Sequence, residues 1–372
     1  MKFITGARPV FGTVRGATLS SLYLVACAAT TNVPPTSKMA EAGDARSPTT
    51  GNVRPWIDTH AHPSGMHSEC STQECANAVV KTMDQFGLRK AVLIHPPSKV
   101  APLSGCELRV QDAVALRPDR FFLGVGGCEL NSAIQATSPS GSADGSIRAA
   151  FHNAAERLIS TAGAVSFGEI AALHLSYEPS HSFEEVPPAA DLIKELASVA
   201  ASHKVPLDLH MDVVQTTKAT PVFYTNRSDQ NAAQIQENVS GLEALLSSNR
   251  AANIVLAHVG RDTTGDMTPN LIDRLLATHE NLFIQLAPAH APLQSANAIL
   301  DSDLMLRPEW EELVRKYASR VVIGSDTFFS GTSADEKHLR IIQSVLKALP
   351  EDTAYRIGCE NPVRIYRLPS GC

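Results

Sequence analysis

From Pro55 onward, apolar and polar positions follow two alternating patterns. Short runs rich in apolar and β-branched residues, bounded by turn residues, are typical of buried parallel strands. Longer segments with apolar residues every three or four positions lie between them and are typical of amphipathic helices. The pattern predicts eight strands, at residues 56–60, 91–95, 121–125, 165–169, 207–210, 254–258, 282–286 and 321–325.

The segments between the strands each have one apolar and one polar face. In residues 149–159, for example, Ala150, Ala154 and Leu158 share one face. Such strands and helices in alternation indicate parallel strands joined by crossover helices. Further helices are expected at 75–86, 189–201, 242–246, 271–277, 310–317 and 338–349.

The spacing of the strand ends specifies the architecture. Consecutive strand ends lie 28 to 48 residues apart, which is room for a crossover helix and its turns. Eight such units predict an α/β fold with a single (β/α)8 TIM-like barrel over residues 55–372, with loop insertions at 127–146 and 211–238. The strand ends are placed at His62, His95, Gly126, Glu169, His210, His258, Leu286 and Asp326.

Composition and charge narrow the class of protein. The 372 residues are 44% hydrophobic and 19% charged, which excludes general disorder. The net charge of −6 argues against broad nucleic-acid binding, which requires a basic surface. A small-molecule substrate is therefore the expected partner, and the oligomeric state stays open.

The N-terminus has the pattern of an export signal. Three basic residues, the last of them Arg15, precede an uncharged apolar stretch at 16–26. This stretch is too short to span a bilayer. The stretch ends at Cys27 in Leu-Val-Ala-Cys, which resembles a lipoprotein box. We expect residues 1–27 to be a lipoprotein-type signal peptide with lipidation at Cys27; an ordinary signal peptide is the alternative.

Residues 28–54 are rich in Ala, Thr, Pro, Ser and Gly and have no apolar face, so they are expected to form a flexible tether. The protein is then periplasmic or anchored to the outer membrane of a Gram-negative-type bacterium, and touches membrane only through its lipid. An oxidising compartment permits disulfides. One is expected among Cys70, Cys75, Cys106 and Cys128, which lie near the first three βα loops.

Histidines and carboxylates fall at the C-terminal ends of five predicted strands, the face where barrel enzymes place their sites. Residues two apart on a strand point to the same side, so His60 and His62 can both face the barrel mouth. Barrel closure places Asp326 beside them, and strands four to six bring a second group together. The six residues are His60, His62, Glu169, His210, His258 and Asp326.

Four imidazoles and two carboxylates are costly to desolvate together unless a cation organises them. Nitrogen and oxygen ligands suit zinc, with manganese, nickel or iron as alternatives. The sequence therefore predicts a divalent metal site, with one or two ions. It contains no G-x-S-x-G, H-E-x-x-H or Gly-Lys-Ser/Thr motif, which argues against the corresponding serine hydrolase, metalloprotease and phosphate-loop chemistries.

The residues Asp58-Thr59-His60-Ala61-His62, Gly168-Glu169, His210, His258 and Asp326, in this order, resemble the amidohydrolase superfamily of metal-dependent hydrolases. The resemblance spans about residues 55–368. The closing residues 361–368 are similar to the end of the amidohydrolase-related branch, which includes aminocarboxymuconate-semialdehyde decarboxylase and dicarboxylate lactonases.

The resemblance implies a role for each of the six residues. His60, His62 and Asp326 bind a first cation, and Asp326 is also the base that takes a proton from water.

His210 and His258 bind a second cation, which Glu169 bridges to the first. In single-metal relatives His210 joins the first ion, and His258 acts catalytically by polarising the substrate. Which arrangement applies stays open.

Further residues are weaker candidates. Asp58 has the position of an acceptor that orients a ligand imidazole, with a strand-end cap as the alternative. Arg261 is a candidate for an anionic substrate group. Four histidines near the predicted mouth are candidates for substrate contact: His95, His174, His181 and His290.

The expected function is hydrolysis of an amide, ester, lactone or phosphoester of a small molecule by metal-activated water. A metal-dependent decarboxylase of the same fold is one alternative. A non-catalytic surface binding module is another, although it has no reason to keep all six ligands.

Overall fold

The computed structural model describes residues 53–65, 68–69, 71–100, 106–161, 163–287, 297–369 and 371–372. The expected signal peptide with Cys27, almost all of the tether, Cys70 and His290 lie outside the described residues. Residues Thr50–Cys372 form one unit with its own core. None of the helices in the described part is both long and apolar enough to cross a bilayer.

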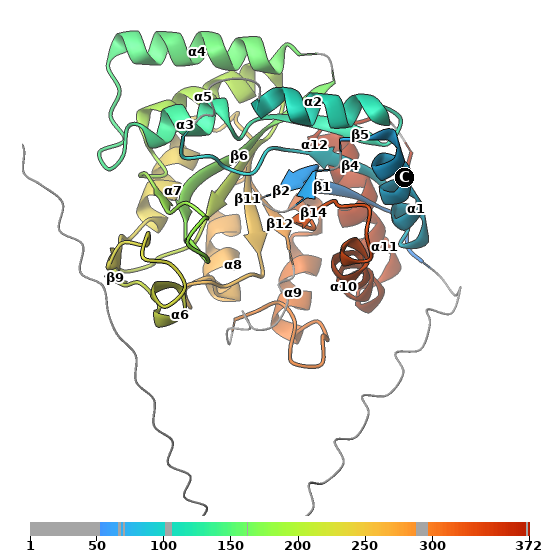
Figure 1. Ribbon diagram of the computed structural model, residues 1–372. Coiled ribbons are helices and arrows are strands. Elements are labelled where there is room, and N and C mark those ends of the chain that lie inside the picture. Colours follow the sequence, from blue (N-terminus) through green and yellow to red (C-terminus); the bar gives the residue numbers. More distant parts are fainter. Residues whose placement is uncertain are drawn as a thin grey trace, which may run out of the picture. The chain divides into compact units, whose positions relative to one another are not determined.

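A ring of mostly parallel strands lies at the centre of this unit, and helices surround it (Figure 1). Consecutive strands pair in parallel, as the alternating pattern predicted. The strands, in order around the ring, are β1 (Trp56–His62), β4 (Leu88–Leu93), β5 (Phe121–Gly126), β6 (Ala164–His174), β8 (Leu207–Met211), β11 (Ile254–Val259), β12 (Leu282–Leu286) and β13 (Val321–Ile323).

The eighth position of the ring is divided between two short strands. β13 pairs with β12, and β14 (Thr327–Phe328), which follows after three intervening residues, pairs with β1. Between them, the backbone N–H of Asp326 donates to the carbonyl of His60 at 2.9 Å. The predicted barrel is therefore closed, and the crossing from one strand to the other carries Asp326 to the ligand strand.

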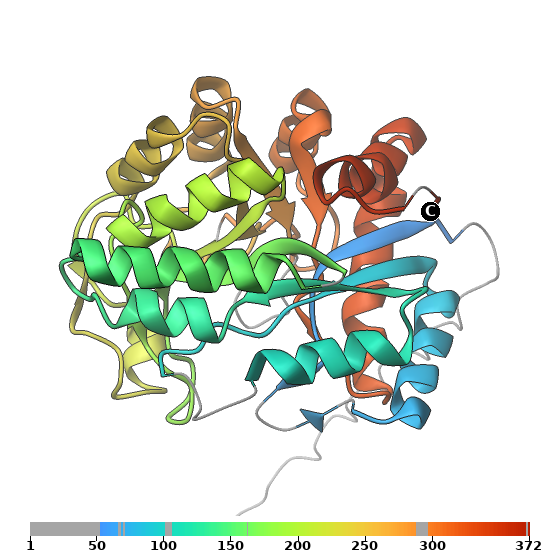
Figure 2. The ribbon, with the colours of Figure 1, turned by 90° about the horizontal axis from the view of Figure 1, so that it is seen from above.

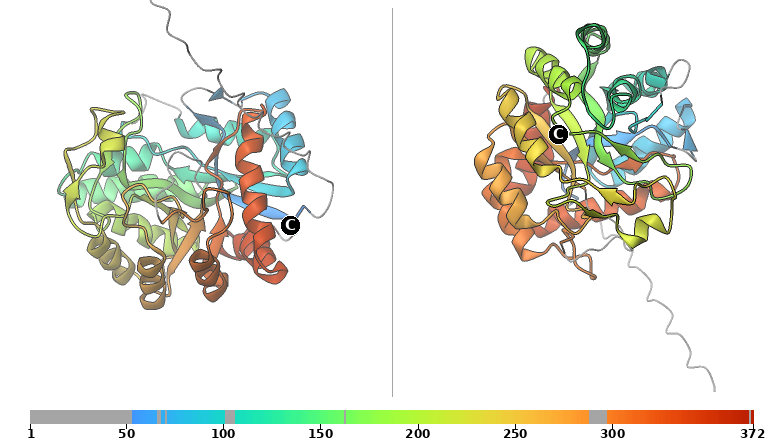
Figure 3. Two further views of the ribbon diagram at one scale, coloured as in Figure 1. Left: turned by 90° about the horizontal axis from the view of Figure 1, so that it is seen from below. Right: turned by 90° about the vertical axis from the view of Figure 1, so that its left-hand side faces the viewer.

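Helices cover the outside of the ring (Figures 2 and 3). Side-chain caps fix several of their starts: the Thr72 hydroxyl accepts from Cys75 N, and Asp144 accepts from Ser146 N. The outer helices are α1 (Gln73–Gln85), α2 (Cys106–Leu116), α4 (Gly145–Ile159), α5 (Asp191–His203), α7 (Val239–Ser248), α8 (Pro269–Thr278), α9 (Pro308–Lys316) and α10 (Ala334–Ala348).

Shorter elements fill the connections. The insertion expected as a loop at 127–146 in fact contains α3 (Glu129–Gln135) and the start of α4, which packs on α5. The insertion at 211–238 holds a small hairpin and one helical turn. The remaining elements are β2 (Ser64–Gly65), β3 (Ser68–Glu69), β7 (Glu184–Glu185), β9 (Lys218–Ala219), α6 (Val222–Thr225), β10 (Gln234–Ile235), η1 (Ala318–Arg320), α11 (Glu351–Tyr355), η2 (Arg356–Glu360) and α12 (Asn361–Ile365).

Three predicted strand ends are wrong by a few residues. Strand β4 ends at Leu93, so His95 follows it, and β13 ends at Ile323, before Asp326. Strand β6 does not end at Glu169 but continues to His174, because its extension pairs antiparallel with β7. His174 is therefore the last residue of β6.

Two apolar clusters hold the barrel together. The larger lies between strands and outer helices, and the smaller fills the barrel interior with residues such as Val92, Val255 and Phe283. Ile365 and Tyr366 of the C-terminal segment complete the interior cluster. The tail thus forms the floor of the barrel.

A disulfide joins Cys106 to Cys128, as expected for the cysteines near the first three βα loops. Cys75 is also disulfide-bonded, and Cys359 pairs with Cys372 near the end of the chain. Beside the first of these bridges, Glu107 accepts hydrogen bonds from three backbone N–H groups between the end of β5 and the start of α3.

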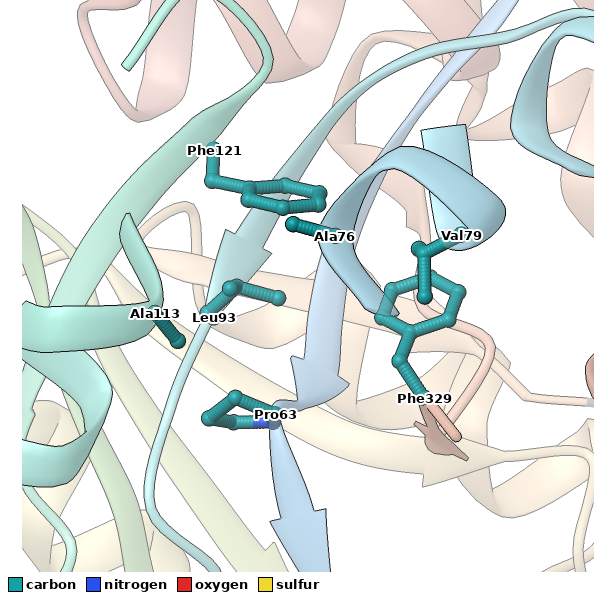
Figure 4. A pocket seen from close by; sticks show the side chains of 7 residues that line it. All are labelled: Pro63, Ala76, Val79, Leu93, Ala113, Phe121 and Phe329. Atoms are coloured by element: carbon teal, nitrogen blue, oxygen red, sulfur yellow. The ribbon is translucent and has the colours of Figure 1, made fainter. Parts of the chain in front are cut away.

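A small apolar cavity of about 10 Å³ lies between α1 and the strands beside it (Figure 4). Its lining offers no polar side chain, and a cavity of this size holds one water molecule at most. It is a packing gap in the core, not a ligand site. The lining residues are Pro63, Ala76, Val79, Leu93, Ala113, Phe121 and Phe329.

Candidate metal centre

The two histidines of β1 lie side by side with their rings 5.1 Å apart. His62 is oriented by its Nδ1–H, which donates to the carbonyl of Ile94 at 2.9 Å. His60 is oriented by Asp208, whose Oδ2 lies 3.2 Å from Nδ1. In both residues this leaves Nε2 directed toward the carboxylates at the mouth of the barrel.

Glu169 lies at the centre of the site. Its Oε1 faces Nδ1 of His210 at 2.6 Å and Nε2 of His258 at 2.9 Å. Its Oε2 faces Nε2 of His60 at 3.3 Å and Nε2 of His62 at 3.7 Å. The carboxylate thus presents one oxygen to each pair of histidines.

Asp326 completes the site from the crossing after β13. Its Oδ1 lies 3.1 Å from Nε2 of His62 and 4.0 Å from Nε2 of His60. Its Oδ2 accepts from Nη1 of Arg261 at 2.5 Å. The six side chains placed at strand ends by the sequence therefore meet at one rim, and Arg261 joins them.

The electrostatics keep both carboxylates ionised. Burial raises the pKa of Glu169, but His60 and the hydrogen bonds from the other imidazoles outweigh burial and hold this pKa well below its usual value. Burial likewise raises the pKa of Asp326, but Arg261 and His258 lower it further. Burial lowers the pKa of His258 to about 3, so this imidazole is neutral. Despite burial, the carboxylates also raise the pKa of His60 and of His210, so a cation that binds at these imidazoles competes with protons.

Two residues of the site have left-handed backbone. His258 has φ +58° and Asp326 has φ +53°, values that residues with a side chain rarely adopt. Such conformations cost about 1–3 kcal/mol each and are concentrated at functional sites. The backbone is therefore strained at two of the six clustered residues.

The donor atoms fit a metal ion. The described residues contain three overlapping groups whose nitrogen and oxygen atoms lie close enough to share an ion: His60 with His258 and Asp326; His60 with His62 and Glu169; and Glu169 with His210 and His258. Nε2 of His60 is buried without a hydrogen-bond partner, which a metal bond would remedy. Imidazole and carboxylate ligands in this number suit a divalent cation.

The predicted substrate residues lie around this cluster at different distances. The ring of His174 contacts that of His210 at 4.1 Å and that of His181 at 4.3 Å. His95 donates from Nδ1 to the carbonyl of Pro96 at 2.6 Å and makes no hydrogen bond to the six clustered side chains.

Asp58 does not orient an imidazole. Its carboxylate accepts from the backbone N–H of His60 at 3.0 Å and from the N–H and hydroxyl of Ser325. It therefore ties the ligand strand β1 to the residue before Asp326, which is the strand-end cap.

The sequence interpretation missed Asp208, which contacts the His60 ring. Asp208 is two residues before His210 on β8, so the strand period of two places both side chains on the same side. That alternation was the signal that could have found it. Gln285 of β12, which donates to Asp208 at 3.1 Å, was missed for lack of any such signal.

The profile of a protein family described as amidohydrolase matches residues 57–368. The match covers most of the chain and every residue of the cluster. This chain belongs to the amidohydrolase family. No curated protein sequence matches it.

Solved structures are similar to this amidohydrolase in fold. A Staphylococcus aureus protein described as a putative amidohydrolase is 12% identical with a TM-score of 0.50, over 85% of this chain and 100% of the other. A probable 2-pyrone-4,6-dicarboxylic acid hydrolase from Acinetobacter baumannii is 13% identical with a TM-score of 0.48, over 85% and 100%. An Agrobacterium tumefaciens protein is 14% identical with a TM-score of 0.48, over 86% and 97%. The first of these likenesses supports the barrel fold.

Proposed function

We propose that this amidohydrolase is a metal-dependent hydrolase that cleaves an amide, ester, lactone or phosphoester bond of a small molecule. One observation carries the proposal. Three groups of side chains each have donor atoms close enough to hold a cation, and His60, Glu169 and His258 each belong to two of these groups. The family match supports an enzyme with hydrolytic chemistry.

Glu169 supports a centre for two cations. Its two oxygens face two different pairs of histidines, so a bridging role for this carboxylate follows from its position. His60, His62 and Asp326 would hold one ion, and His210 and His258 the other. With a single ion, His258 is instead free to polarise the substrate. Zn²⁺ is the ion that we favour, because imidazole and carboxylate are its usual ligands in catalytic sites.

A bound divalent cation lowers the pKa of water toward about 7 and polarises a carbonyl or phosphoryl oxygen. The chain itself has to move the proton. Asp326 is ionised and lies at the cluster, so it accepts the proton of the attacking water and returns it to the leaving group. Arg261 holds the second oxygen of Asp326 and so fixes which oxygen faces the water.

Three residues around the cluster are proposed to contact the substrate. Arg261 is a guanidinium next to the cluster whose side chain keeps 21% of its surface exposed, so it can bind an anionic group. His174 has an unpartnered, buried Nδ1 above His210, and burial together with His210 and His181 lowers the pKa of His174 well below its usual value. His95 follows β4 beside the same rim.

The decarboxylase alternative rested on residues 361–368. In the structure this segment packs at the barrel floor, with Gly358 just before it against Trp56 at the start of β1. It therefore contributes no residue to the chemistry at the mouth. The alternative is tested by product analysis, since it predicts release of carbon dioxide.

The test is turnover of a panel of esters, lactones, amides and phosphoesters by metal-loaded enzyme. His60→Ala should lose bound metal and activity, and Asp326→Asn should lose about 10²–10⁴-fold in kcat/KM. His152→Ala is the matched control, because His152 lies on the exposed helix α4. Metal content near zero in wild-type protein, or equal activity in the Asp326→Asn and wild-type enzymes, would refute the proposal.

We also propose that the enzyme is exported and anchored by a lipid on Cys27. The basic start, the short apolar stretch and the Leu-Val-Ala-Cys sequence support this location. Mass spectrometry of the mature N-terminus checks it, since an intact N-terminus or cleavage elsewhere contradicts it.

A further inference from the structure

Below the metal centre, a layer of buried polar side chains crosses the barrel. Asp208 of β8 is 1% exposed, and its Oδ2 meets both Nδ1 of His60 at 3.2 Å and Nε2 of Gln285 at 3.1 Å. Gln285 of β12 also donates to Oγ1 of Thr59 at 3.2 Å, and this hydroxyl donates to the carbonyl of Ile323 at 2.9 Å. Side-chain contacts therefore link β8, β12 and β1, and the Thr59 hydroxyl extends the layer to the backbone of β13.

Two glycines make the space for this layer. A Cβ on Gly168 would lie 2.6 Å from Cβ of Asp208, and a Cβ on Gly324 would lie 2.3 Å from the amide carbon of Gln285. Both distances are too short for real contacts. The glycines that precede Glu169 and Ser325 are thus needed because Asp208 and Gln285 occupy the barrel interior.

This polar layer lowers the stability of the fold, so a structural role alone does not explain it. Oδ1 of Asp208 and Oε1 of Gln285 are both buried without hydrogen-bond partners. A buried carboxylate that is only partly compensated costs stability, and well-packed apolar residues in such places are often neutral or stabilising. Below the layer, Tyr366 of the C-terminal segment is fully buried, with its hydroxyl close to Thr59 and Gln285, and it excludes water from that side.

The contact between Asp208 and His60 indicates what this layer does. An imidazole that donates from Nδ1 to a carboxylate is held in one tautomer and one orientation, with the lone pair of Nε2 free for a metal. We propose that Asp208, held by Gln285, is a positioning residue that fixes His60 as a ligand and so sets the affinity of the centre for its cation. The inference rests on the proposed metal-dependent function and names a residue that the sequence interpretation did not assign.

The experiment measures metal affinity without reference to turnover. Apoprotein of the full chain is titrated with Zn²⁺ and with Co²⁺ against a competing chelator. Asp208→Asn should raise Kd about 10–100-fold, the usual effect of losing a carboxylate behind a ligand histidine. Asp335→Asn is the matched control, because Asp335 is equally buried but binds backbone N–H groups at the start of α10; its Kd should stay within about twofold of wild type.

A spectroscopic readout separates positioning from general destabilisation. In the Co²⁺ form, the Nδ1–H protons of His60 and His62 should give paramagnetically shifted, exchangeable proton signals. Asp208→Asn should remove or move the signal of His60 and leave that of His62, which is held by the carbonyl of Ile94. Thermal unfolding of the apoproteins reports any change in stability that is independent of metal.

A second variant keeps the test decisive if Asp208→Asn does not fold. Gln285→Met preserves volume but removes the donor to Asp208, and should weaken metal binding about 2–10-fold, the effect of one hydrogen bond. Wild-type affinity and an unmoved His60 signal in the folded variants would overturn the inference. A wild-type protein that binds no metal would instead overturn the proposed function, so the two failures are distinct.

Discussion

Arg261 combines two contacts at the edge of the cluster. Nη1 donates to Asp326, while 21% of the side chain is exposed, so the guanidinium can also meet an anionic group. Removing a charged hydrogen-bonding partner of a substrate costs about 1.5–3 kcal/mol, or roughly 10–100-fold. Arg261→Met should therefore raise KM for anionic substrates by this factor, with a smaller effect on neutral analogues, in steady-state kinetics. Equal effects on both kinds of substrate would contradict an anion-binding role.

At the residue scale, sequence reasoning found the groups that stand at strand ends and missed the groups behind them. His60, His62 and Asp326 could be brought together because strand period and barrel closure are general rules. Asp58 and Asp208 could not be told apart, since both precede a histidine by two positions. The choice depends on which carboxylate faces the His60 ring: Oδ2 of Asp208 lies 3.2 Å from Nδ1, whereas Asp58 accepts from the backbone N–H of His60.

At the scale of elements, the pairing of β6 with β7 places the carboxyl group of Glu184 inside the protein. Burial raises the pKa of Glu184 to about 7, although Asn131 donates to it at 2.7 Å. The folded state therefore binds a proton that the unfolded chain releases near pH 4.5. The free energy of unfolding should fall by on the order of 3 kcal/mol as the pH rises from about 4.5 to 7, and should stay constant above that pH.

Glu184→Gln removes this titration. Urea unfolding at pH 5 and pH 8 should show the variant gaining stability relative to wild type at the higher pH. Glu309→Gln, at the exposed start of α9, is the control and should follow wild type at both values. A difference between Glu184→Gln and wild type that does not change with pH would show that Glu184 does not titrate in this range.

Element types could be predicted well, and their ends less well. The eight strands were found from apolar runs, because a strand buried on both faces is almost continuously apolar. The end of strand β6 was predicted at Glu169, although residues 170–173 continue the apolar run. The extension exists because it pairs with β7, which begins at Glu184, ten residues after β6 ends, and no local pattern specifies this contact.

At the scale of the whole molecule, the cluster joins strands that are far apart in the chain. His60 on β1, Glu169 on β6, His210 on β8, His258 on β11 and Asp326 after β13 all belong to one centre. A cation bound there connects the two ends of the ring, including the closing position that is divided between β13 and β14. Because unfolding separates these ligands, the ion should bind the folded barrel far more tightly than the unfolded chain.

Removing the metal should therefore destabilise the whole barrel in one step. A ligand at a hundred times its Kd stabilises the folded state by about 2.7 kcal/mol. For a unit as long as Thr50–Cys372, with an unfolding entropy of about 0.7 kcal/mol/K, that corresponds to a rise in Tm of about 4 °C. Differential scanning calorimetry of wild-type protein with Zn²⁺ and with a chelator should show this difference, and His60→Ala should show none. A Tm in wild type that is unaffected by metal, or a shift of the same size in His60→Ala, would mean that these six side chains do not hold an ion between the strands.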